Sequence, residues 1–166
     1  NAVLAVLYAA RAMVHNRRTA YREAVDDARA ALERSTDDHE TRTIAELEWG
    51  RAAFHLGEYA EARLHLERVL ALTQGAGQPH WEVRALTMLG LTLLYSGEHS
   101  RGVQLTYTAF HLSRKHQLRL DEARLLNQLG MVFYYQGRYT TAQQYFVHAQ
   151  RGAEAIGNDA TQIAAQ

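Results

Sequence analysis

Glycine recurs along this chain at one fixed interval, in two separate series. The first series is Gly50, Gly90 and Gly130, and the second is Gly57, Gly97 and Gly137. The interval is 40 residues within each series (90 − 50 and 130 − 90; 97 − 57 and 137 − 97). A fixed interval of this length is the sequence signature of a repeat architecture, in which similar units stack on one another. The interval therefore predicts a stack of units instead of a fold around one central core.

Each unit is predicted to be a pair of helices joined at a glycine of the second series. Apolar residues spaced three and four apart indicate a helix on each side, and glycine ends the first helix because it accepts the left-handed conformation. The small residues of the first series let the two helices approach closely, and Tyr59 and Tyr139 are expected to fill the space beside them. We predict an all-α, right-handed solenoid of stacked antiparallel helix pairs, as a single domain over residues 1–166. Its repeats are predicted at 3–35, 38–75, 79–116 and 118–156, followed by a break and the start of a further helix at 159–166.

The first repeat follows this frame less closely than the other three. Ala12 stands where Gly50 stands, and Thr19 stands where Gly57 stands. We expect Thr19 to cap the second helix of this repeat, because a threonine hydroxyl can accept a hydrogen bond from the first helical turn.

The composition argues against several classes of function. Lys+Arg 18 balances Asp+Glu 18, so bulk charge gives no reason to expect a nucleic-acid partner. The absence of cysteine excludes disulfides and thiolate metal sites, and the nine histidines include no i, i+4 pair and no H-E-x-x-H motif. The stretch from Gly75 to Gly77 lacks the Gly-Lys-Ser/Thr ending of a phosphate-binding loop. We therefore expect no catalysis, no cofactor and no metal.

The two ends of the chain suggest a further possibility. The chain begins at Asn1 without a methionine and stops within the run from Thr161 to Gln166, which predicts a piece of a longer protein. Ala2 to Ala10 is apolar over nine residues, whereas a bilayer span needs about 20, so this stretch predicts a core helix and no membrane segment. Solenoid ends normally need a polar cap. Because neither end has one, self-association through the ends is an alternative role.

The repeats resemble the tetratricopeptide repeat family. Its pattern is W-x2-L-G-x2-Y, then A-x3-F, then P, over about 34 residues. The matching residues are Leu126, Leu129, Gly130 and Phe133 with Ala142 and Phe146 in the fourth repeat, Leu86, Leu89, Gly90 and Leu93 in the third, and Glu46, Trp49, Gly50 and Ala53 with Ala62 and Leu66 in the second. The closing proline is missing and the interval is longer, as in the long-helix variant of the family. The resemblance covers nearly the whole chain. It implies a cytoplasmic module that binds a protein or a peptide, as the sensory or scaffolding part of a bacterial multidomain regulator.

The resemblance also implies which residues face the ligand, since the first helix of each pair lines a concave groove in that family. These residues are Arg51 and His55 in the second repeat, Arg84, Thr87, Leu91 and Tyr95 in the third, and Arg124, Asn127, Met131, Tyr134 and Tyr135 in the fourth. Arg84 and Arg124 could each bind a ligand carboxylate through two parallel hydrogen bonds, and Asn127 can both donate to and accept from a peptide backbone.

Two alternatives stay open for these groove positions. The arginines could simply be solvated side chains on a helix face. Of the adjacent Tyr134 and Tyr135, one is expected to face the groove and the other the core. The family's lysine-containing clamp for chaperone tails is not reproduced, because its fifth helix position holds Leu47, Thr87 or Asn127 in the three later repeats.

Overall fold

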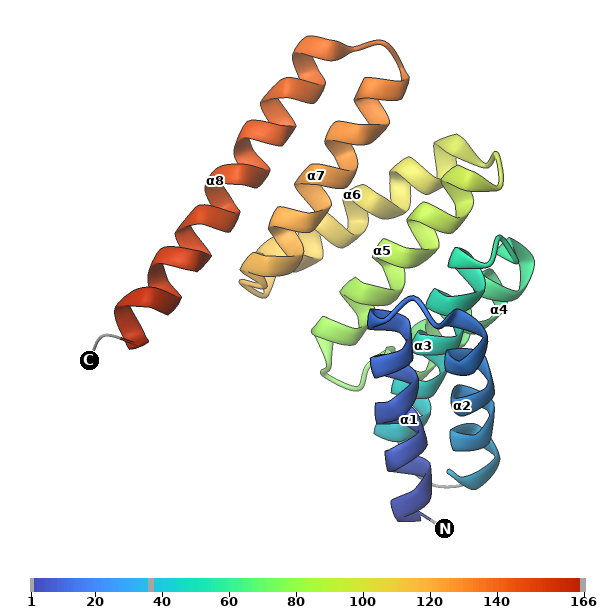
Figure 1. The fold of residues 1–166 in the computed structure, drawn as a ribbon. Helices are drawn as coiled ribbons and strands as arrows, with labels where there is room; N and C mark the ends of the chain where they lie inside the picture. The colour runs from blue at the N-terminus through green and yellow to red at the C-terminus, as the bar shows by residue number, and fades with distance from the viewer. Residues whose placement is uncertain (1, 36–37, 165–166) are drawn as a thin grey trace.

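The computed structural model describes residues 2–35 and 38–164, with side chains as far as residue 157. Eight helices and no strand form this part of the chain, and successive helices run antiparallel (Figure 1). The helices are α1 (Ala2–Arg17), α2 (Tyr21–Arg34), α3 (His39–His55), α4 (Tyr59–Thr73), α5 (Pro79–Tyr95), α6 (His99–Lys115), α7 (Arg119–Tyr135) and α8 (Tyr139–Ala164). They stack as four pairs, which confirms the predicted all-α solenoid.

The corner inside each pair has the same hydrogen-bond pattern. Gly57, Gly97 and Gly137 have φ of +80°, +93° and +74°, as predicted for residues that end a helix in the left-handed conformation. The next backbone N–H then donates to the carbonyl five residues earlier. These bonds are Ala20 to His15 (2.9 Å), Glu58 to Ala53 (2.9 Å), Glu98 to Leu93 (2.8 Å) and Arg138 to Phe133 (2.9 Å). The four corners are therefore copies of one turn.

Thr19 does not cap α2. Its φ is +60°, so it occupies the left-handed corner position that glycine occupies in the later pairs. Ala20 lies at the N-cap of α2 and makes no side-chain hydrogen bond there. The N-cap prediction was wrong because the corner turn, repeated in every pair, fixes the conformation at this position whatever the residue.

The first-series glycines mark the closest approach of two paired helices. A Cβ at Gly50 would lie 2.8 Å from Leu66 Cγ, and a Cβ at Gly130 would lie 2.5 Å from the Phe146 ring. The prediction that tyrosines fill this space was wrong for Tyr139, which is 64% exposed. In an antiparallel pair, residues at similar distances from the turn lie opposite each other. Gly130 comes seven residues before Gly137 (137 − 130) and Phe146 nine residues after it (146 − 137), whereas Tyr139 lies at the turn.

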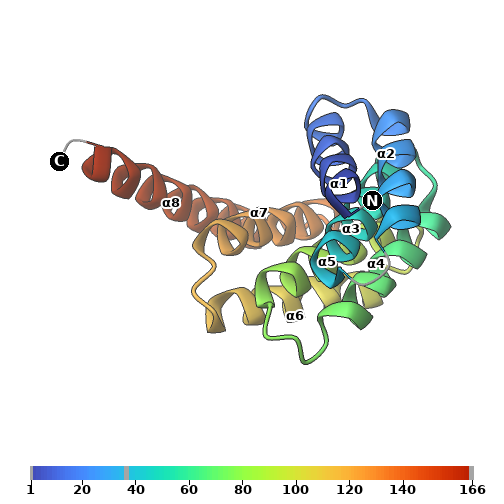
Figure 2. The same ribbon diagram turned by 90° about the horizontal axis from the view of Figure 1, so that it is seen from below.

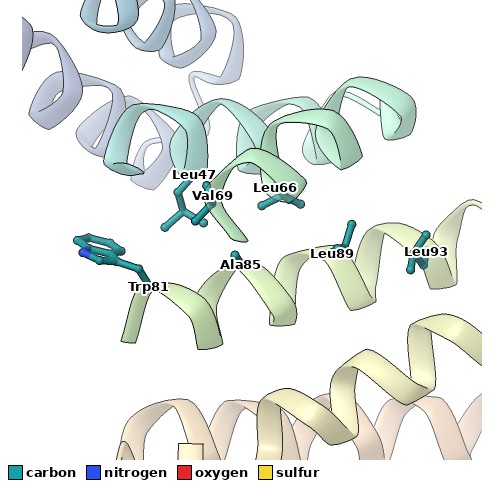
Figure 3. Packing of buried hydrophobic residues seen from close by; sticks show 7 residues of the cluster. All are labelled: Leu47, Leu66, Val69, Trp81, Ala85, Leu89 and Leu93. Atoms are coloured by element: carbon teal, nitrogen blue, oxygen red, sulfur yellow. The ribbon is translucent and has the colours of Figure 1, made fainter. Parts of the chain in front are cut away.

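The core runs along the stack and joins each pair to the next. Leu47 of α3 and Val69 of α4 lie opposite α5, which presents Ala85 and Leu89 to them (Figure 3). A second cluster continues the core, with Val83 of α5 next to Leu125 of α7. Each pair thus buries an apolar face that it could not bury alone, as expected of a solenoid.

The two ends of the stack differ from the predictions. Residues 158–164 continue α8, so the predicted break and separate ninth helix are wrong, and residues 165–166 lie outside the described part. A glycine inside a helix costs only about 1 kcal/mol relative to alanine, which is too little to end α8 at Gly157. The helix projects away from the other pairs (Figure 2). At the other end, α1 buries Ala5 and Ala9, but Val3 is 74% and Leu7 is 59% exposed, so only one face of the predicted core helix is core.

Candidate functional site

The first helices of the four pairs form one side of the stack. α1 contacts α3, α3 contacts α5, and α5 contacts α7. The last two of these contacts involve few residues, so the helices lie apart along most of their length. Two adjoining cavities open between them.

The first cavity, of about 530 Å³, is bounded by all four first helices. Its lining residues are Met13 and Arg17 of α1, Leu47, Glu48, Arg51 and His55 of α3, Arg84, Thr87 and Met88 of α5, and Asp121 and Arg124 of α7. Four arginines therefore face two carboxylates, an excess of two positive charges (4 − 2) in a chain of zero formal net charge. A concave site with an excess of one sign concentrates ligand of the opposite sign.

Both carboxylates of the first cavity are already partnered. The Glu48 side chain is 4% exposed, and it accepts a hydrogen bond of 2.7 Å from the amide of Asn16. Arg51 lies 3.9 Å from Glu48, and Arg124 lies 3.6 Å from Asp121. These separations exceed the roughly 2.7–2.9 Å of a charge-assisted hydrogen bond. The two arginines therefore retain N–H groups that can reach a ligand.

Arg84 is held differently from the other arginines. Its guanidinium carbon lies 5.3 Å from the centre of the Trp81 ring, a cation–π arrangement. Within the described residues it forms no ion pair. A planar guanidinium fixed over a ring keeps its outward N–H groups oriented, which favours bidentate binding of a carboxylate.

His55 is one of the residues that line the first cavity. Its ring stacks on Tyr21 with centroids 4.6 Å apart and an interplanar angle of 12°. Desolvation, and then the positive charge of Arg51, lower the pKa of His55 below its ordinary value. The imidazole is therefore neutral at pH 7 and can accept one hydrogen bond and donate another.

The second cavity, of about 960 Å³, lies between α5 and α7 and is mostly apolar. Its lining residues are Thr87, Leu91, Leu94 and Tyr95 of α5, His99 of α6, and Arg124, Asn127, Gln128, Met131, Val132, Tyr135 and Gln136, which belong to α7 and its C-cap. Gln128 donates a hydrogen bond of 3.0 Å to Thr106, so its amide is committed to the protein. Asn127 is exposed and is free of such a bond among the described residues. Thr87 and Arg124 line both cavities, which therefore adjoin.

The structure brings together all but one of the predicted groove residues. Arg51, His55 and Arg84 line the first cavity, and the others line the second or both. Tyr134 lines neither, and packs edge-on against Tyr139 with ring centroids 5.5 Å apart. The expectation that one of the two adjacent tyrosines faces the core was wrong, because Tyr134 is 49% and Tyr135 is 74% exposed. Both lie in the last turn of α7, next to the corner and beyond the packed part of the pair.

Sequence reasoning missed several cavity residues. Arg17 and Met13 of α1 were overlooked because the first repeat is two residues shorter. The offset of 38 residues (59 − 21) that aligns Tyr21 with Tyr59 also places Arg17 at the position of His55 and Met13 at that of Arg51. This offset of 38 residues could therefore have identified both Arg17 and Met13 as groove residues. Asp121 carried no comparable signal, since its place in the cavity depends on how far α7 splays from α5.

The described residues offer neither a metal site nor a membrane-spanning helix. No cluster of three or more histidine, aspartate or glutamate side chains there is arranged to hold a metal ion. No helix in this part of the chain combines the length and the hydropathy needed to cross a bilayer.

Comparison with known proteins bears on the repeats. Residues 123–155, which span most of α7 and the first part of α8, match the family described as tetratricopeptide repeat. The chain carries a tetratricopeptide repeat. The matched segment contains Gly130, Gly137 and Phe146, the residues that set the corner and the close approach of the last pair. The other three pairs have the same corner hydrogen bond, so the described chain is a stack of similar helix pairs.

Solved structures have the same fold. Aspartyl phosphate phosphatase F from Bacillus subtilis has a TM-score of 0.81 at 14% identity, over 92% of this chain and 41% of that one. A Rap protein complexed with competence and sporulation factor has a TM-score of 0.80 at 18% identity, over 89% of this chain and 42% of that one. The apo form of RapI has a TM-score of 0.80 at 16% identity, over 95% of this chain and 58% of that one. This chain thus spans between two and three fifths of these proteins, and at such identities the likeness concerns the fold alone. No curated protein matches the sequence significantly.

Proposed function

We propose that this chain is a protein- or peptide-binding module, the sensory or scaffolding part of a cytoplasmic bacterial signalling regulator, and that it acts by binding, without catalysis of its own. The observation that carries this proposal is the pair of adjoining cavities between the first helices. One of the structural neighbours was solved in complex with competence and sporulation factor, which supports a binding role for the fold.

The cavities suit a peptide better than a compact small molecule. They adjoin at Thr87 and Arg124, and their linings include residues of α3, α5 and α7, so an elongated ligand can contact these three helices at once. Asn127 offers an amide that can pair with both backbone groups of an extended peptide. The guanidinium group of each arginine can donate two parallel hydrogen bonds to a carboxylate.

The proposal is tested by capture of peptides on an array and of proteins from a lysate, with Asn127→Ala and Arg84→Glu beside the parent chain. Both side chains line the cavities, so both variants should stay folded and lose ligands, the first by roughly 1–3 kcal/mol for the unpaired backbone groups. Arg101→Glu is the matched control, because Arg101 lies on α6, outside both cavities, with its side chain 52% exposed. If both groove variants keep every ligand that the parent binds, the groove is not the binding surface.

Self-association is a second candidate function, favoured by the exposed apolar face of α1. Val3, Leu4, Val6, Leu7 and Val14 are each 44% to 74% exposed on this one helix. Contiguous exposed apolar surface commonly marks an interface. Light scattering at micromolar concentration should then show a dimer or larger species, and Leu7→Glu should reduce its mass to that of a monomer. A parent chain that is monomeric at every concentration would remove this candidate.

A further inference from the structure

We infer that the ligand of this groove is a short extended peptide with two chemically different parts. A carboxylate occupies the first cavity, and apolar side chains about three or four residues away occupy the second. This inference rests on the proposed function and specifies the chemistry and the spacing of the ligand.

The spacing follows from the order of the lining residues along two helices. On α5, Arg84 lines only the first cavity and Leu91, seven residues later (91 − 84), lines only the second. On α7, Met131 lines only the second cavity, and Arg124, seven residues earlier (131 − 124), lines both. Seven helical residues span about 10 Å at 1.5 Å each, a distance that about three extended residues cover at 3.3 Å each. The separation is therefore taken from α5, and the position of Met131 on α7 is compatible with it.

The first cavity selects a negative charge. Arg84 has an aromatic neighbour and forms no ion pair in the described residues, while Arg51 and Arg124 meet their carboxylates only at 3.9 Å and 3.6 Å. Glu48 is buried and bonded to Asn16, so its charge is directed into the protein. A carboxylate placed among the three arginines would gain hydrogen bonds that the protein itself does not supply.

The second cavity selects apolar side chains. Leu91 and Leu94 lie on one wall, and Met131 lies on the other. Tyr95 and Tyr135 are the last residues of α5 and α7, and they are 62% and 74% exposed. A ligand side chain that covers these surfaces removes them from water, the main source of favourable binding energy at such sites.

Asn127 lines the second cavity, one turn after Arg124, which lines both cavities. It comes three residues after Arg124 and four before Met131 on α7, and its side chain is exposed. Its amide therefore faces the stretch of ligand that connects the carboxylate to the apolar side chains. A peptide backbone has the alternating donors and acceptors that a side-chain amide can pair with.

A single-stranded nucleic acid fits this arrangement less well than a peptide. It carries a phosphate at every nucleotide, and it would place phosphates in the second cavity. Among the described residues that line that cavity, Arg124 is the only arginine or lysine. The charge is therefore confined to one part of the groove, which matches a peptide with one acidic end.

The experiment measures fluorescence polarisation with a labelled synthetic peptide. The probe has two apolar residues (leucine and tyrosine), a Gly/Ser spacer of about three residues, and a C-terminal aspartate with a free carboxylate. One analogue amidates the C-terminus and keeps the aspartate, which separates a main-chain carboxylate from a side-chain one. Others replace both carboxylates by amides, replace the apolar pair by serines, or double the spacer. A short oligothymidylate serves as the nucleic-acid probe.

Two matched pairs of variants report on the two parts of the groove. Arg84→Gln is compared with Arg101→Gln, and Tyr135→Ala with the adjacent Tyr134→Ala, since Arg101 and Tyr134 line neither cavity. Circular dichroism of the four variants checks that each one folds. Arg84→Gln and Tyr135→Ala should each weaken binding of the full probe about tenfold, and the controls should not. The carboxylate-free analogue should be insensitive to Arg84→Gln, and the serine analogue to Tyr135→Ala.

The outcomes separate this inference from the proposed function. If array peptides bind through the groove but show no need for a carboxylate, an apolar pair or the spacing, the two-part ligand is wrong and the binding module stands. If oligothymidylate binds more tightly than the full probe, the two-part peptide is likewise overturned. If neither the array nor the probes bind, the proposed function fails together with the inference.

Discussion

At the scale of single residues, the corner of each helix pair shows how strongly one position constrains the chain. The same backbone turn is made by Gly57, Gly97 and Gly137 at φ between +74° and +93°, and by Thr19 at +60°. A β-branched side chain is disfavoured at positive φ because its Cβ meets the backbone. Thr19 is therefore a strained copy of a glycine corner.

This contrast predicts opposite effects for opposite substitutions. Gly137→Val should lower the free energy of unfolding by roughly 1–2 kcal/mol, and Thr19→Gly should raise it by up to about 1 kcal/mol. A Cβ at Gly137 would meet nothing within 4 Å, so the loss comes from the backbone and not from a clash. Urea denaturation measures both changes. Equal stability of Gly137→Val and the parent would refute the role given to the corner.

His55 gives a prediction about pH. Its pKa is lowered by desolvation and by Arg51, so the folded state binds the proton less readily than the unfolded state does. The contribution of His55 to the free energy of unfolding is therefore constant above the ordinary pKa of 6.5 and falls as the pH drops below it. His55→Gln should remove this loss. Urea denaturation of parent and variant at about pH 7.5 and about pH 5.5 tests it, and a stability difference that does not change with pH would contradict it.

At the scale of the helix pair, α3 and α4 are joined by a buried polar contact as well as by apolar packing. His65 Nδ1 lies 2.5 Å from a carboxylate oxygen of Glu46, and both side chains are at most 5% exposed. The Trp49 ring stacks on His65 with centroids 4.1 Å apart, and Arg68 lies 3.7 Å from Glu46. Inside a protein, such a contact is stabilising only while both partners are present.

Removal of one partner should therefore lower the free energy of unfolding by more than removal of both partners does. Glu46→Ala leaves the His65 imidazole buried without its acceptor and should lower the free energy of unfolding by roughly 2–4 kcal/mol. The double variant Glu46→Met with His65→Leu should recover most of this loss. Thermal and urea denaturation give the two values. A double variant less stable than Glu46→Ala would show that the pair itself contributes net stability.

The sequence predicted the pairs better than it predicted their surfaces. The glycine interval and the three-four spacing are local signals, and they located the corners and the close approach of α7 to α8. The tyrosines at the ends of α7 and α8 were misplaced because their exposure depends on how the pairs splay, a property of tertiary packing. The groove row was predicted from the family resemblance, and all of its residues except Tyr134 line a cavity. Asp121 was missed because its position relative to α3 and α5 is set by the curvature of the stack.

At the scale of the whole molecule, the described helices contact only helices of their own pair and of the adjacent pairs. α7 shares fewer contacts with α6 than α3 shares with α2 or α5 shares with α4, and its contact with α5 is slight. The α7–α8 pair also lies at one end, where it projects from the rest (Figure 2). In a solenoid, stability is approximately a sum of unit and interface terms, so a unit with a weak interface opens first.

Hydrogen exchange measures this difference directly. We expect the backbone amides of α7 and α8 to exchange faster than those of α3, α4 and α5. The faster exchange should come from local opening of the last pair, during which α3, α4 and α5 stay folded. Substituting Leu125, which is fully buried in the core that joins α5 to α7, by alanine should widen the difference. Uniform protection along the stack would mean that the eight helices open as one cooperative unit.

The weak attachment of the last pair has a consequence for affinity. The second cavity has one wall on α5 and the other on α7, so it exists only in molecules in which the last pair is docked. The measured dissociation constant is then the intrinsic one divided by the docked fraction, and a ligand that bridges the two walls shifts the population toward the docked state. A partner could thus be sensed as a change in the attachment of one helix pair, and any domain that follows α8 would be positioned by whether the ligand is present.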